Sequence, residues 1–227
     1  MRLRPRAGTL PTVSGLPIDV AGERVILLPH RALYWPARRT LAVADLHWGK
    51  PETFQAFGLP IPSGVLADDL ARLGAAVAAT GAERLLLLGD LIHGRHGLTD
   101  RVIEEGAIWL AECPAQVLLV EGNHDAHVDA LPTDWALPVL PELHDGPFCF
   151  RHEPESHPER FVWAGHVHPV AVLRGRRRRG SLRLPCFHIE AHRGILPAFS
   201  AFTGGGRLEA GQARRFAIAG DQVVPVQ

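Results

Sequence analysis

The stretch TLAVADLH at residues 40–47 decides the fold, because an apolar, strand-like run ends there in side chains that can bind metal. The same arrangement recurs four more times along the chain. The runs at 84–88, 116–120, 148–150 and 161–164 lead to Asp90, to Asn123, to His152, and to the pair His166 and His168. In open α/β sheets, ligands bind at the carboxyl ends of the strands. One Asp-x-His arises by chance, but five strand ends in this order indicate residues that converge on one site.

Composition and charge restrict the class of protein. The chain has 227 residues, and 46% of them are hydrophobic, which is ample for a sizeable core. We expect one domain over residues 1–227, with residues 1–15 as a poorly ordered tail. The formal net charge is +0, so no global basic field attracts nucleic acid. The basic residues are almost all arginine, which the composition of the source genome explains as well as phosphate binding does.

The cysteines and the hydropathy indicate a cytoplasmic protein. Cys113, Cys149 and Cys186 are widely spaced and form no C-x-x-C pattern, which argues against a disulfide framework or a thiolate zinc site. A reducing cytosol is therefore the compartment we expect. No apolar stretch approaches the ~20 residues needed to span a bilayer.

The order of predicted elements gives the fold class. Strands are expected at 24–28, 32–35, 40–44, 84–88 and 116–120, a long loop at 48–62, and helices at about 64–79, with Ser63 as the N-cap, and about 100–112. This first half reads β-α-β-α-β, which implies parallel strands. Strands dominate the second half, at 148–152, 160–165, 185–191, 196–202 and 215–219. We predict an α/β fold, a four-layer α-β-β-α sandwich of two packed mixed sheets flanked by helices, with the metal site at the carboxyl ends of the strands.

Seven residues at the strand ends offer oxygen or imidazole nitrogen donors, and none is a thiolate: Asp45, His47, Asp90, Asn123, His152, His166 and His168. Such a set suits Mn²⁺, Fe²⁺ or Zn²⁺ better than Ca²⁺ or Mg²⁺. Seven ligands are too many for one catalytic ion and suit two ions that share a carboxylate. Because only Asp45 and Asp90 are charged, two divalent ions would leave a net charge of about +2, which attracts a phosphate ester. Two-metal sites clamp the attacking and leaving oxygens of a displacement, and we expect a bridging water as the nucleophile.

Each donor taken alone has a structural explanation. A single histidine is more often a satisfied structural residue than a ligand, Asp90 could cap a helix, and Asn123 could belong to a turn. Taken jointly, chance would have to place seven suitable donors at the ends of five strands. We therefore interpret the set as a dinuclear metal centre for phosphoester chemistry.

This series of motifs resembles that of the calcineurin-like metallophosphoesterase superfamily. The superfamily has Asp-x-His, Gly-Asp, Gly-Asn-His-Asp/Glu, a lone His and Gly-His-x-His, which match residues 45–47, 89–90, 122–125, 152 and 165–168. The resemblance implies one ion on Asp45, His47 and His168. It implies a second ion on Asn123, His152 and His166, with Asp90 bridging the two. It further implies that His124 stabilises the transition state and protonates the leaving oxygen, and that Asp125 orients His124.

One segment departs from many phosphatases of the superfamily, which have Gly-Asp-x-x-Asp-Arg. This chain has GDLIHGR at residues 89–95. The departure weakens a protein-phosphatase interpretation and leaves the metal ligands intact. His93 could support the ligands from outside the metal-binding set, and Arg95 could reach the phosphate, but either could equally be an ordinary loop residue.

A narrower resemblance, to the bacterial DNA ligase-associated metallophosphoesterases, covers most of the chain. It rests on ALYWP at 32–36, ADLHWGK at 44–50, GLPIP at 58–62, GDLIH at 89–93, PAF at 197–199 and FTGG at 202–205. It implies a Mn²⁺-dependent DNA endonuclease or phosphodiesterase in DNA repair. It also implies a functional association with an ATP-dependent DNA ligase, a helicase and an exonuclease-like protein.

Two features bear on DNA binding independently of that resemblance. The segment RGRRRR at 174–179, with Arg176, Arg177 and Arg178 as candidate phosphate contacts, follows the last metal motif; a solvated turn explains it equally well. Trp48, Phe54 and Phe57 could stack on unpaired bases, although such residues more often pack a loop onto its domain. With neutral net charge, these features favour single strands or loops over duplex DNA.

The leading hypothesis is a dinuclear phosphodiesterase that cleaves DNA with a metal-bridging hydroxide, His124 being the acid. The same centre could instead act on a small-molecule phosphate ester, because the metals recognise only the phosphate. A non-catalytic scaffold on the same fold would have degraded ligands or lack the catalytic histidine. Asp45, Asp90 and His124 are all present, so we favour an enzyme.

Overall fold

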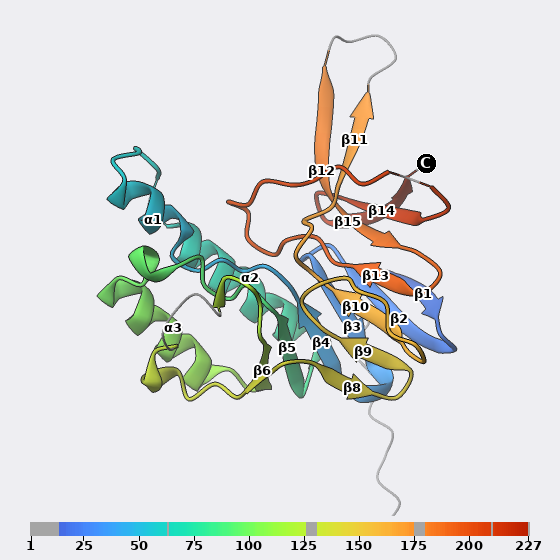
Figure 1. Ribbon diagram of the computed structural model, residues 1–227, viewed down its shortest axis with the longest axis horizontal. Coiled ribbons are helices and arrows are strands. Elements are labelled where there is room, and N and C mark those ends of the chain that lie inside the picture. Colours follow the sequence, from blue (N-terminus) through green and yellow to red (C-terminus); the bar gives the residue numbers. More distant parts are fainter. Residues whose placement is uncertain (1–13, 63, 126–130, 175–179, 210, 227) are drawn as a thin grey trace, which may run out of the picture.

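Two β-sheets pack against each other, and the α-helices lie on the outer side of the first sheet (Figure 1). The computed structural model describes residues 14–62, 64–125, 131–174, 180–209 and 211–226. Two packed mixed sheets were expected, and they are confirmed. In the described part of the chain all α-helices lie before residue 113, so the second sheet has no helical layer of its own where four layers were expected.

The first sheet has seven strands in the order of the sequence: β1 (Leu16–Val20), β2 (Glu23–Leu28), β3 (Ala32–Trp35), β4 (Thr40–Val43), β5 (Arg84–Leu88), β6 (Gln116–Val120) and β7 (Val139–Leu140). The first four strands pair antiparallel and the last four pair parallel. β5 is apolar along its length because both of its faces are covered. The parallel strands end at one edge, where the segments that carry Asp45, Asp90 and Asn123 follow.

The second sheet has the order β15-β14-β12-β13-β10-β9-β8, with β11 paired to β12. Its strands are β8 (Leu143–Asp145), β9 (Phe148–Phe150), β10 (Phe161–Ala164), β11 (Val170–Arg174), β12 (Ser181–Ile189), β13 (Arg193–Ile195), β14 (Arg214–Ala219) and β15 (Gln222–Val226). β10 pairs parallel with β9 and with β13, whereas the other pairs are antiparallel. The β11–β12 hairpin projects from the body of the molecule (Figure 1).

The α-helices are α1 (Lys50–Ala56), α2 (Val65–Thr80) and α3 (Asp100–Glu112), of which α2 and α3 pack on the first sheet. The predicted apolar face of α2 is confirmed, because Leu66, Leu70, Leu73 and Val77 are all buried in the core beneath it. Thr99 caps α3, its side chain accepting a hydrogen bond from the N–H of Val102. No helix in the described ranges is long and apolar enough to cross a membrane.

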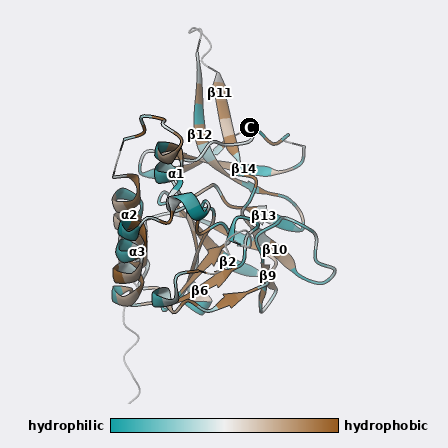
Figure 2. Cartoon of the chain, turned by 60° about the vertical axis from the view of Figure 1, so that its left-hand side comes forward, coloured by the Kyte–Doolittle hydropathy of each residue, from teal (hydrophilic) through white to brown (hydrophobic). Residues whose placement is uncertain are grey.

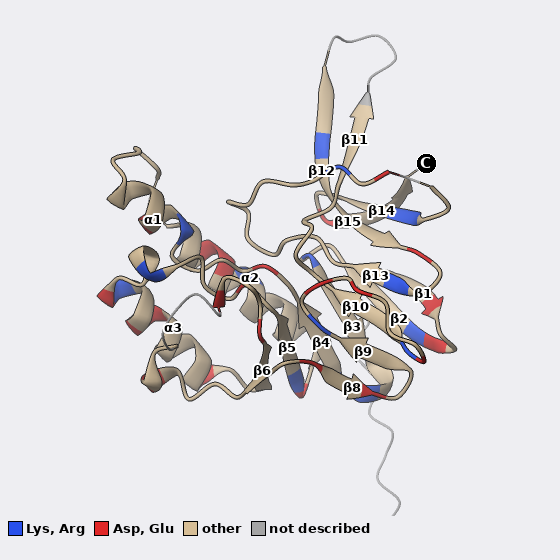
Figure 3. Ribbon diagram, viewed as in Figure 1, with Lys and Arg blue, Asp and Glu red and all other residues tan. Residues whose placement is uncertain are grey.

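A second core fills the space between the sheets. Leu86 and Leu88 of the first sheet meet Phe148, Phe150 and Trp163 of the second there. The rings of Phe148 and Trp163 are 6.0 Å apart in an edge-to-face contact. Hydrophobic strands accordingly lie in the interior (Figure 2), while acidic and basic residues are interspersed over the ribbon (Figure 3). The first sheet is thus packed on both faces, which holds the ends of its strands in place.

Two sequence predictions of secondary structure were wrong, and some strands were not predicted. The expected loop 48–62 contains α1, which begins after Gly49 in a left-handed conformation and has a proline in its first turn, where the missing N–H costs nothing. The expected strand 196–202 is absent from these described residues; the strand there, β13, ends at Ile195. The hairpin partner β11 was not foreseen. Ser63, the expected N-cap, lies outside the described residues.

Trp48 is a core residue and not a platform for bases. Its side chain is 2% exposed. Its ring meets those of Trp135 at 5.4 Å and Trp109 at 6.5 Å, both edge to face. A base could reach this ring only if the helical layer opened.

We predict that Trp48→Ala lowers the free energy of unfolding by about 3–5 kcal/mol, because a large buried ring leaves a cavity. Ile108→Ala, which removes an exposed apolar side chain from α3, should change it by less than about 0.5 kcal/mol. Urea unfolding followed by circular dichroism measures both. Equal values for the two variants would contradict the core assignment of Trp48.

Candidate metal centre

Five of the seven predicted donors occupy a strained backbone conformation. Asp45, His47, Asp90, His166 and His168 have φ angles of 58°, 50°, 51°, 69° and 53°. Residues other than glycine seldom adopt this left-handed region; asparagine, aspartate and histidine do so more often than the rest, and such strained positions gather at functional sites. Each of these residues follows the end of β4, β5 or β10, so the chain turns sharply there and directs the side chains to one place.

The first group of donors consists of Asp45, His47, Asp90 and His168, whose ligand atoms all lie within 4.8 Å of one another. The Nε2 atoms of His47 and His168 are 3.3 Å apart. His168 Nε2 is 3.3 Å from Asp45 Oδ1, and His47 Nε2 is 3.8 Å from Asp90 Oδ2. These contacts bring the ends of β4, β5 and β10 together.

The second group consists of Asp90, His152 and His166, and Asn123 joins it. Asn123 Oδ1 is 2.9 Å from His152 Nε2 and 3.0 Å from His166 Nδ1. His152 Nε2 is 3.1 Å from His166 Nδ1 and 3.4 Å from Asp90 Oδ1. Asp90 therefore belongs to both groups, through one carboxylate oxygen each.

The second group fits a bound cation. His152 Nδ1 lies 3.0 Å from the carbonyl oxygen of Leu88 and donates to it, which leaves the lone pair on Nε2. That lone pair faces Asn123 Oδ1, which is an acceptor as well, so the two atoms cannot satisfy each other. Ligand atoms about 2.1 Å from a common ion and at right angles to each other lie about 3 Å apart. The distances in this group match that value.

Carbonyl groups orient the imidazoles of both donor groups. His168 Nδ1 lies 3.1 Å from the carbonyl oxygen of Gly204 and donates to it, so Nε2 faces Asp45 and His47. Leu88 does the same for His152. Such partners fix the tautomer and the ring orientation of a ligand. Sequence reasoning missed both partners, and backbone carbonyls give no residue signal by which it could have found them.

Burial and neighbouring charge set the protonation of the imidazoles. Burial, with the charges of Lys50 and three neighbouring histidines, lowers the pKa of His47 to about 2. Its ring is therefore neutral and has a free lone pair. Burial disfavours the charged form of His168, but its hydrogen bond to Asp45 and the charge of Asp45 outweigh that effect and raise its pKa. A protonated His168 cannot bind a cation, so a cation at the first group competes with this proton. Binding there should therefore strengthen as the pH rises.

His124 lies beside the two groups without belonging to the seven donors. Its Nε2 is 3.9 Å from Asp90 Oδ2 and its backbone N–H donates to Asp90 Oδ1 at 2.9 Å. Its Nδ1 donates to the carbonyl oxygen of His93 at 2.9 Å. Nε2 is thus the nitrogen left to exchange a proton at the centre.

Asp125 does not orient the ring of His124, contrary to the expectation from the resemblance. Its carboxylate accepts hydrogen bonds from the N–H groups of Ile92 and Gly122, at 3.1 and 3.0 Å. Burial raises the pKa of Asp125 to about 6, against these two hydrogen bonds. Asp125 therefore ties the segment after β6 to the segment after β5, and the carbonyl of His93 takes the orienting role.

The structure places the remaining predicted site residues differently. The ring of His93 stacks on that of His124 with centroids 5.1 Å apart, and burial, with the charges of Lys50 and His124, lowers its pKa to about 4. Arg95 is an exposed residue of a short 3-10 helix, η2 (Arg95–Gly97). Arg176, Arg177 and Arg178 lie outside the described residues. His93 is therefore placed at the centre, and Arg95 is exposed on η2.

A cavity of about 870 Å³ lies elsewhere, lined by residues that include Asp19, Arg160, His188, Glu190 and Arg214. None of the seven donors lines it. The metal centre is instead an open site, since His166 is exposed and His168 is half-buried. The chemistry belongs to the donors, and we assign no role to the cavity.

The arrangement of donors on these strand ends defines a metal-binding phosphoesterase, and the chain belongs to the calcineurin-like phosphoesterase family, whose model matches residues 38–193. No curated protein matches the chain. Among solved structures, it is similar to the crystal structure of Pseudomonas putida nuclease MPE, with a TM-score of 0.80 and 37% sequence identity over 92% of this chain and 98% of that chain. The protein is thus a hydrolase of phosphoester bonds, and this neighbour fits the DNA ligase-associated type.

We predict that Gly89→Ala weakens metal binding at least tenfold. A Cβ atom there would collide with the imidazole of His152, and the φ of +75° adds backbone strain. Gly22→Ala is the matched control, because its φ is +81° and nothing lies near the added Cβ. Titration calorimetry with Mn²⁺ measures both affinities. Equal weakening by both variants would mean that backbone strain, and not the position of His152, controls binding.

We predict that the metal-free protein loses stability as the pH falls below 6.5. Folding holds the pKa of His47 at about 2 instead of 6.5, so below pH 6.5 the unfolded chain binds a proton that the folded one does not. The free energy of unfolding should fall by about 1.4 kcal/mol per pH unit from this residue. Urea unfolding between pH 7 and 4.5 should therefore show a shallower pH slope for His47→Gln. Parallel slopes would refute this account.

Proposed function

We propose that the protein is a dinuclear, Mn²⁺-dependent phosphodiesterase that cleaves DNA in unpaired regions during repair. The observation that carries this proposal is the position of Asp90, whose two carboxylate oxygens face the two donor groups. A shared carboxylate suits two ions at the separation of ~3.5–4 Å that phosphoester hydrolysis uses. The oxygen and imidazole donors, without thiolate, favour Mn²⁺, with Fe²⁺ or Zn²⁺ as the other possibilities.

The two donor groups support a division of the ligands between two ions. Asp45, His47 and His168 would hold one ion, and Asn123, His152 and His166 the other, with Asp90 between them. When bound, the two ions would neutralise the phosphate and acidify the attacking water. Asp45 and Asp90 are buried, and backbone N–H groups fix both carboxylates. Ligands held in this way need little reorganisation during the reaction.

His124 would act as the acid. Its Nδ1–H is committed to the carbonyl of His93, so Nε2 carries the proton that is given to the leaving oxygen. The stacked ring of His93, which is neutral at pH 7, covers one face of the imidazole without adding a competing charge. His124 is thereby held at the edge of the donors, where a leaving group can reach it.

DNA as the substrate has three supports. The neighbour of known structure is a nuclease. The segment 174–179 contains five arginines; Arg174 ends β11, and residues 175–179 lie outside the described part of the chain. The zero net charge disfavours tight duplex binding and is compatible with unpaired strands. We further propose that the protein acts in the cytoplasm, where its free cysteines stay reduced, beside an ATP-dependent DNA ligase, a helicase and an exonuclease-like protein, which the motif resemblance alone supports.

The test is hydrolysis of an end-labelled DNA stem-loop by the purified protein with Mn²⁺. We expect cleavage in the loop, no cleavage after chelation, and a kcat that is about 10²–10⁴-fold lower for His124→Ala, because general-acid catalysis contributes about that much. The Mn²⁺ content of that variant should stay the same. His144→Ala, which removes a histidine bound to Glu142 away from the donors, should behave as the unchanged protein.

Two results would redirect the assignment. Turnover of bis(4-nitrophenyl) phosphate without DNA cleavage would keep the dinuclear mechanism and favour a small-molecule phosphodiester. Full activity of His124→Ala would remove His124 as the acid.

A further inference from the structure

Two pairs of aromatic rings connect α1 with η2 beside the metal centre. Phe54 lies on α1 and Phe57 directly follows its last residue, Ala56. Their rings contact those of His93 and His96, which are likewise three residues apart. The inner pair, Phe54 and His93, is stacked, with centroids 6.1 Å apart and an interplanar angle of 19°. The outer pair, Phe57 and His96, has centroids 5.5 Å apart at an angle of 54°. Residues three apart on a helix share a face, so the two pairs follow each other along α1.

We call the two pairs, Phe54 with His93 and Phe57 with His96, the ladder of rings. Its inner pair contacts the metal centre. His93 stacks on His124 at 5.1 Å and 23°, so Phe54, His93 and His124 form a nearly parallel stack. The ring of His47 meets those of His93 and His124 edge to face at 5.4 and 5.1 Å. The position of α1 is therefore fixed relative to a metal donor and to the proposed acid.

Backbone contacts make the connection between α1 and η2 rigid. A Cβ atom on Gly49 would collide with Gly97, and a Cβ atom on Gly97 would collide with Gly49. Such close approach is open only to glycine. The N–H of His93 also donates to the carbonyl of Trp48, at 3.0 Å. The outer pair is thus carried on a firm support and not on a loose loop.

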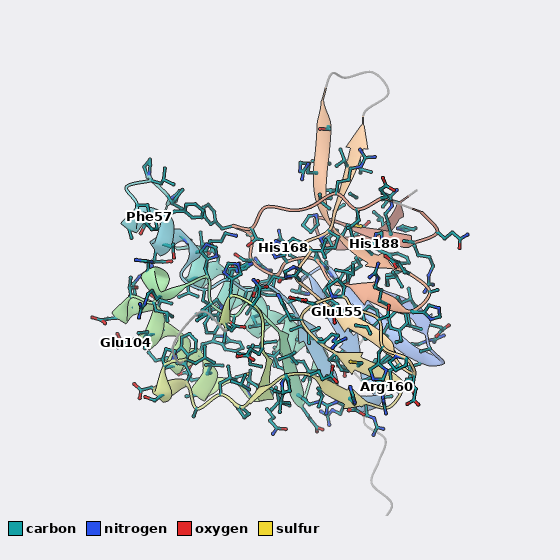
Figure 4. All side chains as sticks on the ribbon, viewed as in Figure 1. Phe57, Glu104, Glu155, Arg160, His168 and His188 are labelled. Atoms are coloured by element: carbon teal, nitrogen blue, oxygen red, sulfur yellow. The ribbon has the colours of Figure 1, made fainter. Side chains whose placement is uncertain are left out.

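The outer pair faces solvent. Phe57 is 70% exposed, which is the highest value among the large apolar residues in the described ranges, and Leu59, two residues on, is 48% exposed. A single exposed apolar side chain needs no explanation. Phe57, however, pairs with His96 directly after α1, the helix whose Phe54 stacks on His93 beside the centre. Figure 4 labels it at the end of α1, and His168 marks the metal centre in the same view.

We propose that Phe57 and His96 form a subsite for one nucleobase of the DNA strand whose phosphate lies at the metal centre. The proposal rests on the DNA-cleaving function proposed above. A flat base continues the series of rings, and stacking on an aromatic side chain is how unpaired strands are held without regard to sequence. A duplex keeps its base faces stacked on one another and offers none to Phe57. The subsite thus selects unpaired DNA, which the metal donors alone cannot do.

The geometry also gives the position of that base. Phe57 directly follows α1, which starts three residues after His47, and seven residues of helix extend about 10 Å at 1.5 Å per residue. Successive phosphates along one strand advance about 3.4 Å when the bases are stacked, and more when they are not. The base on Phe57 should therefore lie about two or three nucleotides from the cleaved bond.

The test uses single-stranded oligonucleotides of one sequence whose cleavage site has been mapped. Each carries one abasic residue, and its distance from the cleaved bond differs from one oligonucleotide to the next. With the full chain and Mn²⁺, we expect KM to rise about tenfold when the abasic residue lies at the subsite, which is a typical loss of one base–aromatic stack. Phe57→Ala should raise KM for the intact oligonucleotide by a similar factor and be insensitive to the abasic residue at that position. Phe57→Trp should keep the response of the unchanged protein.

Ile108→Ala is the matched control, since Ile108 is an exposed apolar residue (51%) on a different helix, α3; it should behave as the unchanged protein. If Phe57→Ala and Ile108→Ala give the same KM while the unchanged protein cleaves the oligonucleotide, the subsite is wrong and the proposed function stands. If the unchanged protein hydrolyses bis(4-nitrophenyl) phosphate but no oligonucleotide, the proposed function fails and the subsite with it.

Discussion

Two buried carboxylates, Asp45 and Asp90, impose the constraint on which the site depends. Removing a carboxylate from water is costly unless cations or hydrogen bonds compensate. Backbone amides supply part of that compensation, through the N–H of His166 on Asp45 and the N–H of His124 on Asp90. The neighbouring imidazoles direct ring nitrogens toward these carboxylates. A neutral imidazole carries no full positive charge with which to balance them. Divalent cations bound by these donors would complete the electrostatic balance.

The fold holds this arrangement against its own strain. A left-handed conformation at a residue other than glycine costs on the order of 1–2 kcal/mol, and five of the donors adopt it. Such turns persist only where the surrounding structure determines them. Here the parallel register of β4, β5 and β6 fixes where each turn begins, and the cores on both faces of the first sheet prevent the strands from shifting. Close approach at Gly89, Gly122 and Gly165 then lets the turns touch one another. The packing of the two cores thus compensates for the backbone strain at this edge of the sheet.

The residues that the sequence singled out as donors do come together in the structure, because each follows an apolar run whose burial fixes its place. It failed where contacts between distant segments decide the structure. The helix α1 forms in a stretch rich in glycine and proline because Gly49 packs on Gly97, a contact that no local pattern reveals. Asp125 stood next to His124 in the chain, which suggested that it orients the ring, but its carboxylate is turned to the N–H groups of Ile92 and Gly122. Trp48 followed a metal motif and yet faces the helical core. Side-chain direction within a turn is a tertiary property, so spacing could identify the residues of the site but not their partners.

The metal donors and the selection of substrate belong to different parts of the molecule. A dinuclear centre recognises a phosphate and acts alike on every ester that reaches it, so selectivity must come from its surroundings. In our proposal the ladder of rings supplies that selectivity. It also contacts the proposed acid, His124, through His93. His93 stacks on Phe54 with one face and on His124 with the other, and its carbonyl orients the His124 ring. A base that settles on the outer pair, however, finds a support already fixed by the inner pair and the glycine contact. Binding there should add affinity without moving His124, so recognition of the strand should be expressed in KM, while kcat stays the property of the donors and the acid.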